Sequence, residues 1–464
     1  MDHGSPIVVP AYSYVRAEQP KPGRKIPDED WGGFLDGFLG SNQRAFDALG
    51  LEPRIVAGRE RIRLELRAGG RAGAVPLISP VTGQVAGGVV IAPRFGWSGV
   101  GRVLSATGWG SGPEFLPFPL VPGSGREVPP WVLAGPVLAR IAEMLGSLRV
   151  GYREVQQLRS QPRGRIEWAE YARRQLASGQ WHRLPCRFSE LDSDRRLRQA
   201  IRWTLERVYG ELRGVGNDST ASGLASLALQ LLEKVADVVS VRPRTMDLQR
   251  NFGSSAMASR ALSEGLRAMG WVADERGLGG GRMSDGLSWS LPLELLWERY
   301  VESVYRLEAL QRGATVRSGQ SGETTIPLGW RQGAIKSMTH LVPDLVISAH
   351  EEVQIVDAKY KPHFQDLTVG GWQRFTDSAS EAHRADVHQV LAYAASLPAD
   401  VDVRATLVYP VMSDLYEELE RRRVGVAVAD IPRGAGTLRL ELRALAFGKG
   451  SDVSRDPTDY RGSY

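Results

Sequence analysis

The chain has 464 residues, of which 42% are hydrophobic and 24% are charged, with a formal net charge of +5 at pH 7. This length predicts two to four domains, and the mild positive charge is compatible with a nucleic-acid partner without requiring one. The single cysteine, Cys186, excludes a disulfide framework, a cysteine-ligated iron–sulfur cluster and a zinc ribbon. We see no apolar run of the roughly 18 residues that a membrane span needs and no secretory signal, so we expect no membrane partner and a cytoplasmic location.

Residues 1–128 are predicted to form an arm followed by a β-rich domain. Residues 1–30 are polar and proline-rich, and residues 31–51 have the pattern of a short helix. From residue 54 to about residue 103, apolar residues alternate and glycines punctuate them, which predicts several strands. No G-x-x-x-x-G-K-[ST] loop occurs in the sequence, so the chain is not expected to hydrolyse ATP or GTP through a P-loop.

Residues 129–285 are predicted to form a helical middle region that ends in a glycine-rich linker, residues 277–286. Helices are expected within residues 129–149, 153–178, 184–213, 222–240 and 254–272, and Ser193 is well placed as a helix cap. Two arginine groups could be solvated helix faces or a phosphate-contacting surface. They are Arg159, Arg163 and Arg165, and Arg195, Arg196 and Arg198.

Residues 286–464 contain the stretch in which acidic residues, a lysine and strand patterns converge. Branched apolar residues at 345–348 and 353–356 predict two consecutive strands separated by a polar turn. Asp344 opens the first strand and Asp357 ends the second. Because side chains alternate across a strand, Asp357 and Lys359 project from the same face. The chain uses only seven lysines among 58 basic residues, so a lysine here suggests a role that arginine does not fill.

This set of groups suits phosphodiester hydrolysis. Carboxylates from adjacent strands, Asp344 and Asp357, can hold Mg²⁺ or Mn²⁺, and the backbone carbonyl of Ala358 can add a ligand. The metal polarises the phosphate and lowers the pKa of bound water, while Lys359 orients that water or stabilises the pentavalent charge. The structural alternative is that Asp344 caps a strand and that Asp357 and Lys359 form an exposed ion pair.

The sequence Pro343-Asp344 followed by Asp357-Ala358-Lys359 resembles the PD-(D/E)XK nuclease motif. In that superfamily a helix with an acidic residue at the metal edge precedes the core. The resemblance therefore implies that Glu298, in the amphipathic run of residues 291–310, is this acidic residue. Glu294 and Glu302, one turn to either side, are the alternative candidates. If Glu298 has no such role, it is a solvated helix residue.

Gln389 and Tyr393 match the Q-x-x-x-Y helix of RecB-like members and would hold the backbone or the lysine. Since they are four residues apart, they share one helical face. Zinc binding by His383 and His388 around Asp386 is disfavoured, because their spacing of five places them poorly on one face. The expected fold is α/β, with a C-terminal PD-(D/E)XK core made of a mixed sheet flanked by helices.

The remaining elements of residues 286–464 are expected in a simple order. A long loop covers residues 361–381, the Gln389 helix follows, and an apolar strand spans residues 403–411. Residues 424–448 read as edge strands, and the tail after them is predicted to be disordered.

Beyond this motif, the chain is similar to McrC, the nuclease subunit of McrBC modification-dependent restriction systems. The DAKYK wording of residues 357–361, the VVIAPRFG run of residues 89–96 and the middle segment, Arg163-Gly164-Arg165 followed by residues 184–194, carry this resemblance. It spans roughly residues 85–415, whereas the first 85 residues match nothing. An asparagine that is common in the family's middle segment is not found near residues 194–198.

The McrC resemblance implies an endonuclease that cuts double-stranded DNA for restriction and antiviral defence. It also implies a McrB-like AAA+ GTPase or ATPase ring as the partner, contacted by residues 1–128. Two other functions stay open: a stand-alone RecB-like exonuclease or repair nuclease, and a non-catalytic DNA-binding scaffold that activates a partner ATPase. Two uncompensated carboxylates kept close together argue against the scaffold.

Overall fold

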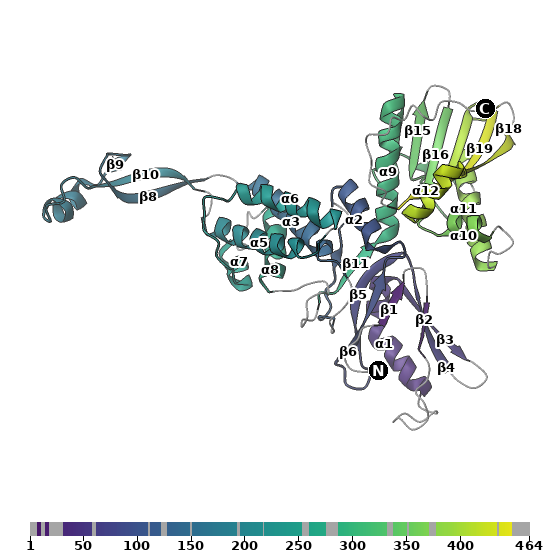
Figure 1. Cartoon of the computed structure of the whole chain (residues 1–464), viewed down its shortest axis with the longest axis horizontal. Helices are drawn as coiled ribbons and strands as arrows, with labels where there is room; N and C mark the ends of the chain where they lie inside the picture. The colour runs from purple at the N-terminus through teal and green to yellow at the C-terminus, as the bar shows by residue number, and fades with distance from the viewer. Residues whose placement is uncertain are drawn as a thin grey trace. The chain divides into compact units, whose positions relative to one another are not determined.

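The computed structural model describes residues 7–10, 14–17, 31–57, 62–109, 112–121, 128–148, 151–192, 195–216, 218–252, 259–274, 286–331, 337–349, 352–370, 377–433 and 436–447. The chain divides into two compact units, residues 1–133 together with 277–464, and residues 134–276 (Figure 1). Ser193, nearly all of the glycine-rich linker and the C-terminal tail lie outside the described residues. In the part described, no helix is long and apolar enough to cross a membrane.

A six-stranded mixed sheet forms the C-terminal part of the first unit, in the order β12-β15-β16-β17-β19-β18. Strand β16 pairs antiparallel with β15 and parallel with β17, which pairs parallel with β19. The two strands predicted around the acidic residues are therefore neighbours. The strands are β12 (Thr315–Ser318), β15 (Leu345–Ala349), β16 (Glu352–Ala358), β17 (Asp402–Val411), β18 (Val426–Arg433) and β19 (Gly436–Ala446).

Helices cover both faces of this sheet. On one face, Glu308 of α9 (Leu293–Arg312) pairs with Arg443 of β19. On the other face, buried side chains of α11 (Asp377–Ala395) such as Val390 share a core with Leu407. Helices α10 (His363–Gly370) and α12 (Ser413–Arg422) also pack against the sheet's strands. Helix α9 ends at Gly313, whose φ of 66° favours glycine.

Two expectations for this sheet are corrected. The segment expected to be a loop, residues 361–381, contains helix α10. The side chain of Phe364 on this helix is buried in the core. Of the two strands expected at the edge, only β18 is one. Strand β19 lies between β17 and β18 and ends in the buried residues Ala444, Leu445 and Ala446.

The N-terminal segment of the first unit contains a five-stranded and a three-stranded sheet, in the orders β1-β6-β5-β11-β7 and β2-β4-β3. The first sheet contains β1 (Ile7–Pro10), β5 (Arg71–Ile78), β6 (Val85–Ala92), β7 (Glu114–Phe115) and β11 (Trp289–Pro292). The second contains β2 (Tyr14–Ala17), β3 (Leu51–Ala57) and β4 (Ile62–Ala68). The helices of this N-terminal segment are α1 (Trp31–Leu49) and α2 (Gly96–Ala106).

Strand β11 comes from the part of the sequence predicted to be a separate nuclease domain, yet it pairs with β5. Gly73 permits this pairing, because a Cβ atom there would lie 2.4 Å from the Trp289 carbonyl oxygen. Helix α9 begins directly after β11. The helix that carries Glu298 is therefore an extension of the N-terminal sheet.

Helix α2 shows that one prediction was wrong, because strands were expected up to about residue 103. Its buried residues Val100, Val103 and Leu104 have helical spacing, but three glycines obscure that pattern. One of them, Gly99, is needed for close packing, since a Cβ atom there would lie 2.5 Å from Phe447 Cδ1.

The second unit combines helices with a three-stranded sheet in the order β8-β10-β9. The helices are α3 (Trp131–Ser147), which spans the boundary of the units, α4 (Trp168–Glu170), the π-helical turn η2 (Tyr171–Leu176), α5 (Arg195–Arg213), α6 (Ser219–Glu233), α7 (Thr245–Phe252) and α8 (Arg260–Ala273). The strands are β8 (Gly151–Arg159), β9 (Arg165–Ile166) and β10 (Leu184–Asp192).

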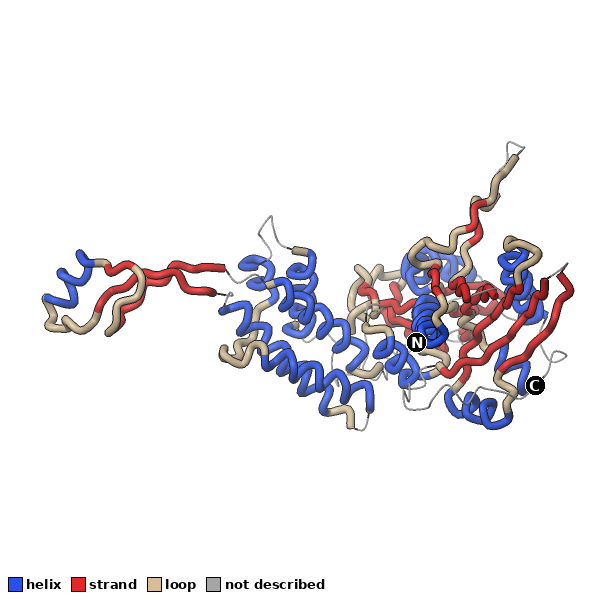
Figure 2. Tube along the Cα trace, turned by 90° about the horizontal axis from the view of Figure 1, so that it is seen from above, coloured by secondary structure: helices blue, strands red, loops and turns tan. Residues whose placement is uncertain are grey.

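The strands of the second unit correct the helices expected within residues 153–178 and at the start of residues 184–213. Strands β8 and β10 pair along nine residues each as a long antiparallel ribbon, drawn in red in Figure 2. Their glutamine, arginine and glutamate residues favour a helix locally. Pairing between distant segments overrides that preference, which is weak in any case.

Candidate active site

Asp344 lies just before β15 and is fixed by the end of β16. Its Oδ2 accepts a hydrogen bond of 2.7 Å from the backbone N–H of Ala358. Burial, then the charges of Asp357 and Glu298, raise the pKa of the Asp344 carboxyl to about 8, against the opposing effect of the hydrogen bond from Ala358. The short bond explains why a carboxylate at this point of the sequence is held against the neighbouring strand.

Asp357 and Lys359 form a close ion pair, with 2.7 Å between Oδ2 and Nζ. The side chains are only 2% and 17% exposed, so the exposed ion pair considered from the sequence is not what the fold contains. Burial raises the pKa of Asp357, although Lys359 lowers it in part. Burial alone would lower the pKa of Lys359, but Asp357 outweighs it and the net shift is upward.

Gln389 and Tyr393 extend this pair through α11. Lys359 Nζ donates to Gln389 Oε1 over 3.0 Å, and Gln389 Nε2 donates to the Tyr393 hydroxyl over 2.6 Å. Tyr393 is buried in the core. Four predicted side chains, from the end of β16 and from α11, are therefore joined in one line, in which Gln389 fixes Lys359.

Glu298 is the α9 glutamate that faces this group. Burial raises its pKa, and the electrostatic influence of Asp357 and Lys359 reaches it. The alternative candidate Glu302 is engaged in other contacts. Its carboxylate pairs with Arg306 at 2.7 Å and accepts a hydrogen bond of 3.0 Å from Ser318 Oγ. The charge of the other alternative candidate, Glu294, contributes to the raised pKa of Glu298.

The donor set fits a hard divalent cation. Three carboxylates, Asp344, Asp357 and Glu298, face one lysine, and burial or mutual repulsion raises the pKa of each. Asp357 Oδ2 is buried and makes no hydrogen bond besides its ion pair with Lys359. Among the described residues, no group of three or more His, Cys, Asp or Glu side chains lies close enough together to hold a metal ion, so Asp344 and Asp357 are the nearer pair and Glu298 is not grouped with them. Mg²⁺ suits such a site, because it accepts one or two carboxylates and retains water.

Sequence reasoning missed the turn of residues 318–324, which contacts Asp344 and Glu298. Thr324 Oγ1 donates to the Pro343 carbonyl over 2.6 Å, and Gln320 Nε2 lies 3.5 Å from Glu298 Oε2. Its glycine- and serine-rich composition indicates a turn. Nothing in that composition says that the turn lies beside an acidic residue more than twenty positions away.

A second buried polar cluster was also missed. Lys361 Nζ lies 2.7 Å from Asp386 Oδ1, and the ring of His363 packs against those of His383 and Tyr409. Burial, followed by the charge of Lys361, lowers the pKa of His363 to about 4. His388 is exposed whereas His383 is buried, so the two histidines of the disfavoured zinc hypothesis point to different environments.

The arginine groups of the middle region make contacts within it. The guanidinium groups of Arg159 and Arg163 lie 5.6 and 4.3 Å from the Phe188 ring centre. Arg198 donates to the Asp237 carboxylate and, over 2.9 Å, to the Lys234 carbonyl. The first group lies in the β8–β10 region, so it is not a solvated helix face. A phosphate-contacting role remains a prediction.

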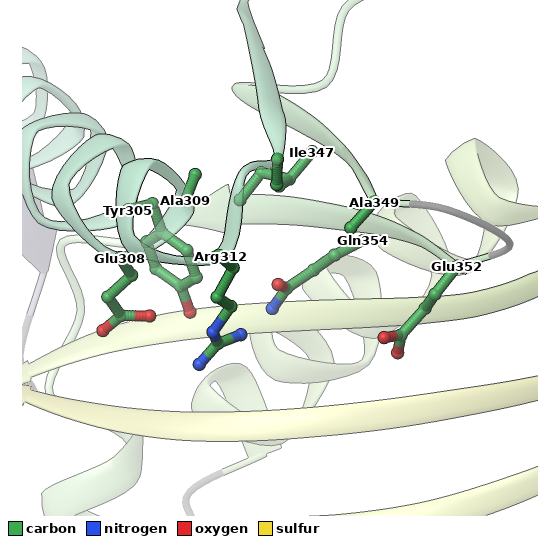
Figure 3. Close-up of a pocket in the computed structure, with 9 residues that line it drawn as sticks. Tyr305, Glu308, Ala309, Arg312, Ile347, Ala349, Glu352 and Gln354 are labelled. Carbon is green, nitrogen blue, oxygen red and sulfur yellow. The ribbon is translucent and has the colours of Figure 1, made fainter. Parts of the chain in front are cut away.

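The pocket of Figure 3 is separate from the candidate active site. Its lining side chains come from the C-terminal half of α9 and from the β15–β16 hairpin, and include Tyr305, Glu308, Arg312 and Gln354. None of the predicted site residues lines it. A concave shape therefore does not locate the acidic group, whose position follows from the motif and its contacts.

One family model matches the chain. Residues 142–410, more than half of the chain, match the family described as McrBC 5-methylcytosine restriction system component. The chain is similar to one in a refined half-complex from the tetradecameric assembly of Thermococcus gammatolerans McrB AAA+ hexamers with bound McrC, at 13% identity and a TM-score of 0.38, over 95% of this chain and 94% of that one. For the cryo-EM structure of the Thermococcus gammatolerans McrBC complex the values are 14%, 0.28, 66% and 88%. No curated protein gives a match.

Proposed function

The chain belongs to the family of McrBC 5-methylcytosine restriction system components, and from this premise we propose that it is the Mg²⁺-dependent DNA endonuclease subunit of such a system. It hydrolyses phosphodiester bonds in double-stranded DNA and works with an AAA+ GTPase or ATPase ring. The observation that carries the proposal is the buried pair Asp344 and Asp357 beside a lysine that Gln389 holds in place.

Each side chain has a distinct role in this proposal. Asp344 and Asp357, with the Ala358 carbonyl, would hold Mg²⁺ or Mn²⁺, and Glu298 would complete the shell. When bound, the metal supplies Lewis-acid activation of the phosphate and a water of lowered pKa. Lys359 donates a hydrogen bond to the attacking water or to the phosphate oxygen on which negative charge develops.

Gln389 and Tyr393 act through Lys359. The Gln389 carbonyl accepts from the ammonium group, and its amide is fixed by the buried Tyr393 hydroxyl. This restricts the lysine to one direction before DNA arrives. Such preorganisation matters, because misplacement by about 1 Å can cost about 100-fold in rate.

The sequence contains no P-loop motif for nucleotide hydrolysis. In this proposal the ring partner hydrolyses the nucleotide and supplies the energy. The match to the McrBC family supports this assignment. For the DNA modification that is recognised, we propose only a class, namely a methylated base.

The proposal is tested by cleavage of methylated and unmethylated DNA, circular and linear, with Mg²⁺, with and without a McrB-like AAA+ protein from the same genome. Wild type is compared with Asp357→Ala and Lys359→Ala, and with Asp430→Asn as a control at an exposed carboxylate on β18. We expect cleavage that needs the ring and is lost in the two site variants only. Cleavage from ends without the ring would instead establish an exonuclease, and ring stimulation without cleavage a scaffold.

A further inference from the structure

We propose that the turn of residues 318–324 is the positioning element of the metal site, with Thr324 and Gln320 as its positioning residues. The inference rests on the proposed nuclease function and deepens it. The turn contacts both of the segments that bring acidic side chains to the site from outside β16, namely the Pro343-Asp344 segment and α9.

The turn fixes the backbone on both sides of the Asp344 Cα atom. Thr324, which is 3% exposed, donates from Oγ1 to the Pro343 carbonyl over 2.6 Å. The backbone N–H of Gly319 donates to the Asp344 carbonyl over 2.8 Å. Residues 342–344 lie between β14 (His340–Leu341) and β15, where the ladder of the sheet does not hold them. Two bonds from one turn therefore hold the acidic motif.

Gly319 makes this close approach possible. A Cβ atom at position 319 would lie 2.6 Å from the Pro343 carbonyl oxygen, 3.1 Å from Val342 Cγ1 and 3.2 Å from Thr324 Oγ1. A backbone oxygen cannot move aside as the end of a flexible side chain can. Glycine at this position thus follows from contact with the motif as well as from turn chemistry.

The same turn contacts the acidic face of α9. Gln320 Oε1 accepts from Arg299 Nε over 3.2 Å, which directs the amide nitrogen to Glu298 Oε2 at 3.5 Å. Ser318, which is 1% exposed, donates from Oγ to Glu302 Oε2 over 3.0 Å. The carboxylate of Glu323 closes the turn by accepting from the Ser318 N–H over 3.1 Å.

These contacts oppose a repulsion that the site creates. Asp344 and Glu298 are like charges when both are ionised, and they come from elements that are not paired with each other, so without a metal they tend to separate. A turn hydrogen-bonded to both keeps them near the geometry that an ion needs. Weakening it lowers metal affinity before it alters the chemical step.

The experiment compares Thr324→Val with Thr324→Ser, which restores the hydroxyl, in the full chain. Binding of Mn²⁺ alone is measured calorimetrically without DNA, and the Mg²⁺ concentration for half-maximal cleavage is measured with the ring. The adjacent Thr325→Val is the matched control, because the Thr325 hydroxyl donates to Gly322 within the turn. We expect Thr324→Val to weaken Mn²⁺ binding about tenfold, and Thr324→Ser and Thr325→Val to bind within about twofold of wild type.

Gln320→Ala guards against misfolding of Thr324→Val, since Gln320 lies on the exposed side of the turn. We expect about threefold weaker Mn²⁺ binding for it, the size of a modest exposed hydrogen bond. If Thr324→Val and Gln320→Ala bind Mn²⁺ like wild type, the inference is wrong while the nuclease proposal stands. If wild type itself neither binds Mn²⁺ nor cuts DNA with the ring, the nuclease proposal fails first.

Discussion

Metal binding should release a proton from the acidic pair near neutral pH. Burial, then the charge of Asp357, then that of Glu298, raise the pKa of Asp344 to about 8. A divalent cation binds the ionised carboxylate, so the protonated form must lose its proton first. The buried position of Asp344 thereby becomes a measurable linkage between pH and metal affinity.

The size of the effect follows from that pKa. At pH 6.5 a carboxyl with a pKa of about 8 is about 97% protonated, and at pH 9 it is about 10% protonated. Binding therefore releases about one proton per ion at pH 6.5 and about one tenth at pH 9, and affinity rises about tenfold per pH unit below pH 8. The pKa of Asp357 is also raised, and its contribution has the same sign.

The assay is calorimetry of Mn²⁺ binding at fixed pH in buffers of different ionisation enthalpy. The slope of observed heat against ionisation enthalpy gives the number of protons released. Glu298→Gln removes one of the charges that raise the pKa of Asp344, so at pH 8 it should release fewer protons than wild type and at pH 6.5 about as many. A wild-type heat at pH 6.5 that does not depend on the buffer would refute this account of the site.

Three further predictions test neighbouring groups. Lys359→Arg should cut DNA at least about 100-fold more slowly while binding Mn²⁺ within a few-fold of wild type, because a planar guanidinium does not replace the ammonium; single-turnover cleavage and calorimetry separate the two. Gln389→Ala should slow cleavage about tenfold or more through the freed lysine, and Gln389→Glu should shift the pH profile. Burial lowers the pKa of His363 to about 4, so the folded state excludes a proton that the unfolded state binds. The free energy of unfolding should therefore fall by about 2 kcal/mol, after allowance for solvent screening, as pH drops from about 6.5 to 4. In thermal unfolding, His363→Gln should lose less stability over this pH range.

The sequence predicted the local arrangement of the site well, because period and chemistry agree there. Asp357 at the end of β16 and Lys359 just after it are two residues apart, and Gln389 and Tyr393 are four apart on α11, so each pair shares a face; the contacts of 2.7 and 3.0 Å around Lys359 follow that geometry. Glu298 required a resemblance, since three glutamates at helical spacing are equivalent until the tertiary contacts of Glu302 distinguish them.

The missed strands of the second unit and the missed 318–324 turn have a common physical cause, which is contact between segments that are distant in sequence. Strands β8 and β10 are polar and locally helix-favouring, and only their mutual register makes them strands. The 318–324 turn looks like any glycine-rich connection until Thr324 is seen against Pro343. Local patterns carry no information on which distant partner a segment meets.

The contacts between the N-terminal sheet and the six-stranded C-terminal sheet give the predicted boundary at residue 286 a different meaning. Strand β11 completes the N-terminal sheet and α9 starts from it. Phe95, which directly precedes α2, packs on Tyr360 and Phe447 at 5.4 and 5.5 Å between ring centres. Tyr360 directly follows Lys359 in the sequence. A displacement of the N-terminal sheet would thus reach Glu298 through α9 and Lys359 through Tyr360, so residues contributed by both halves of this unit determine the geometry at the candidate active site.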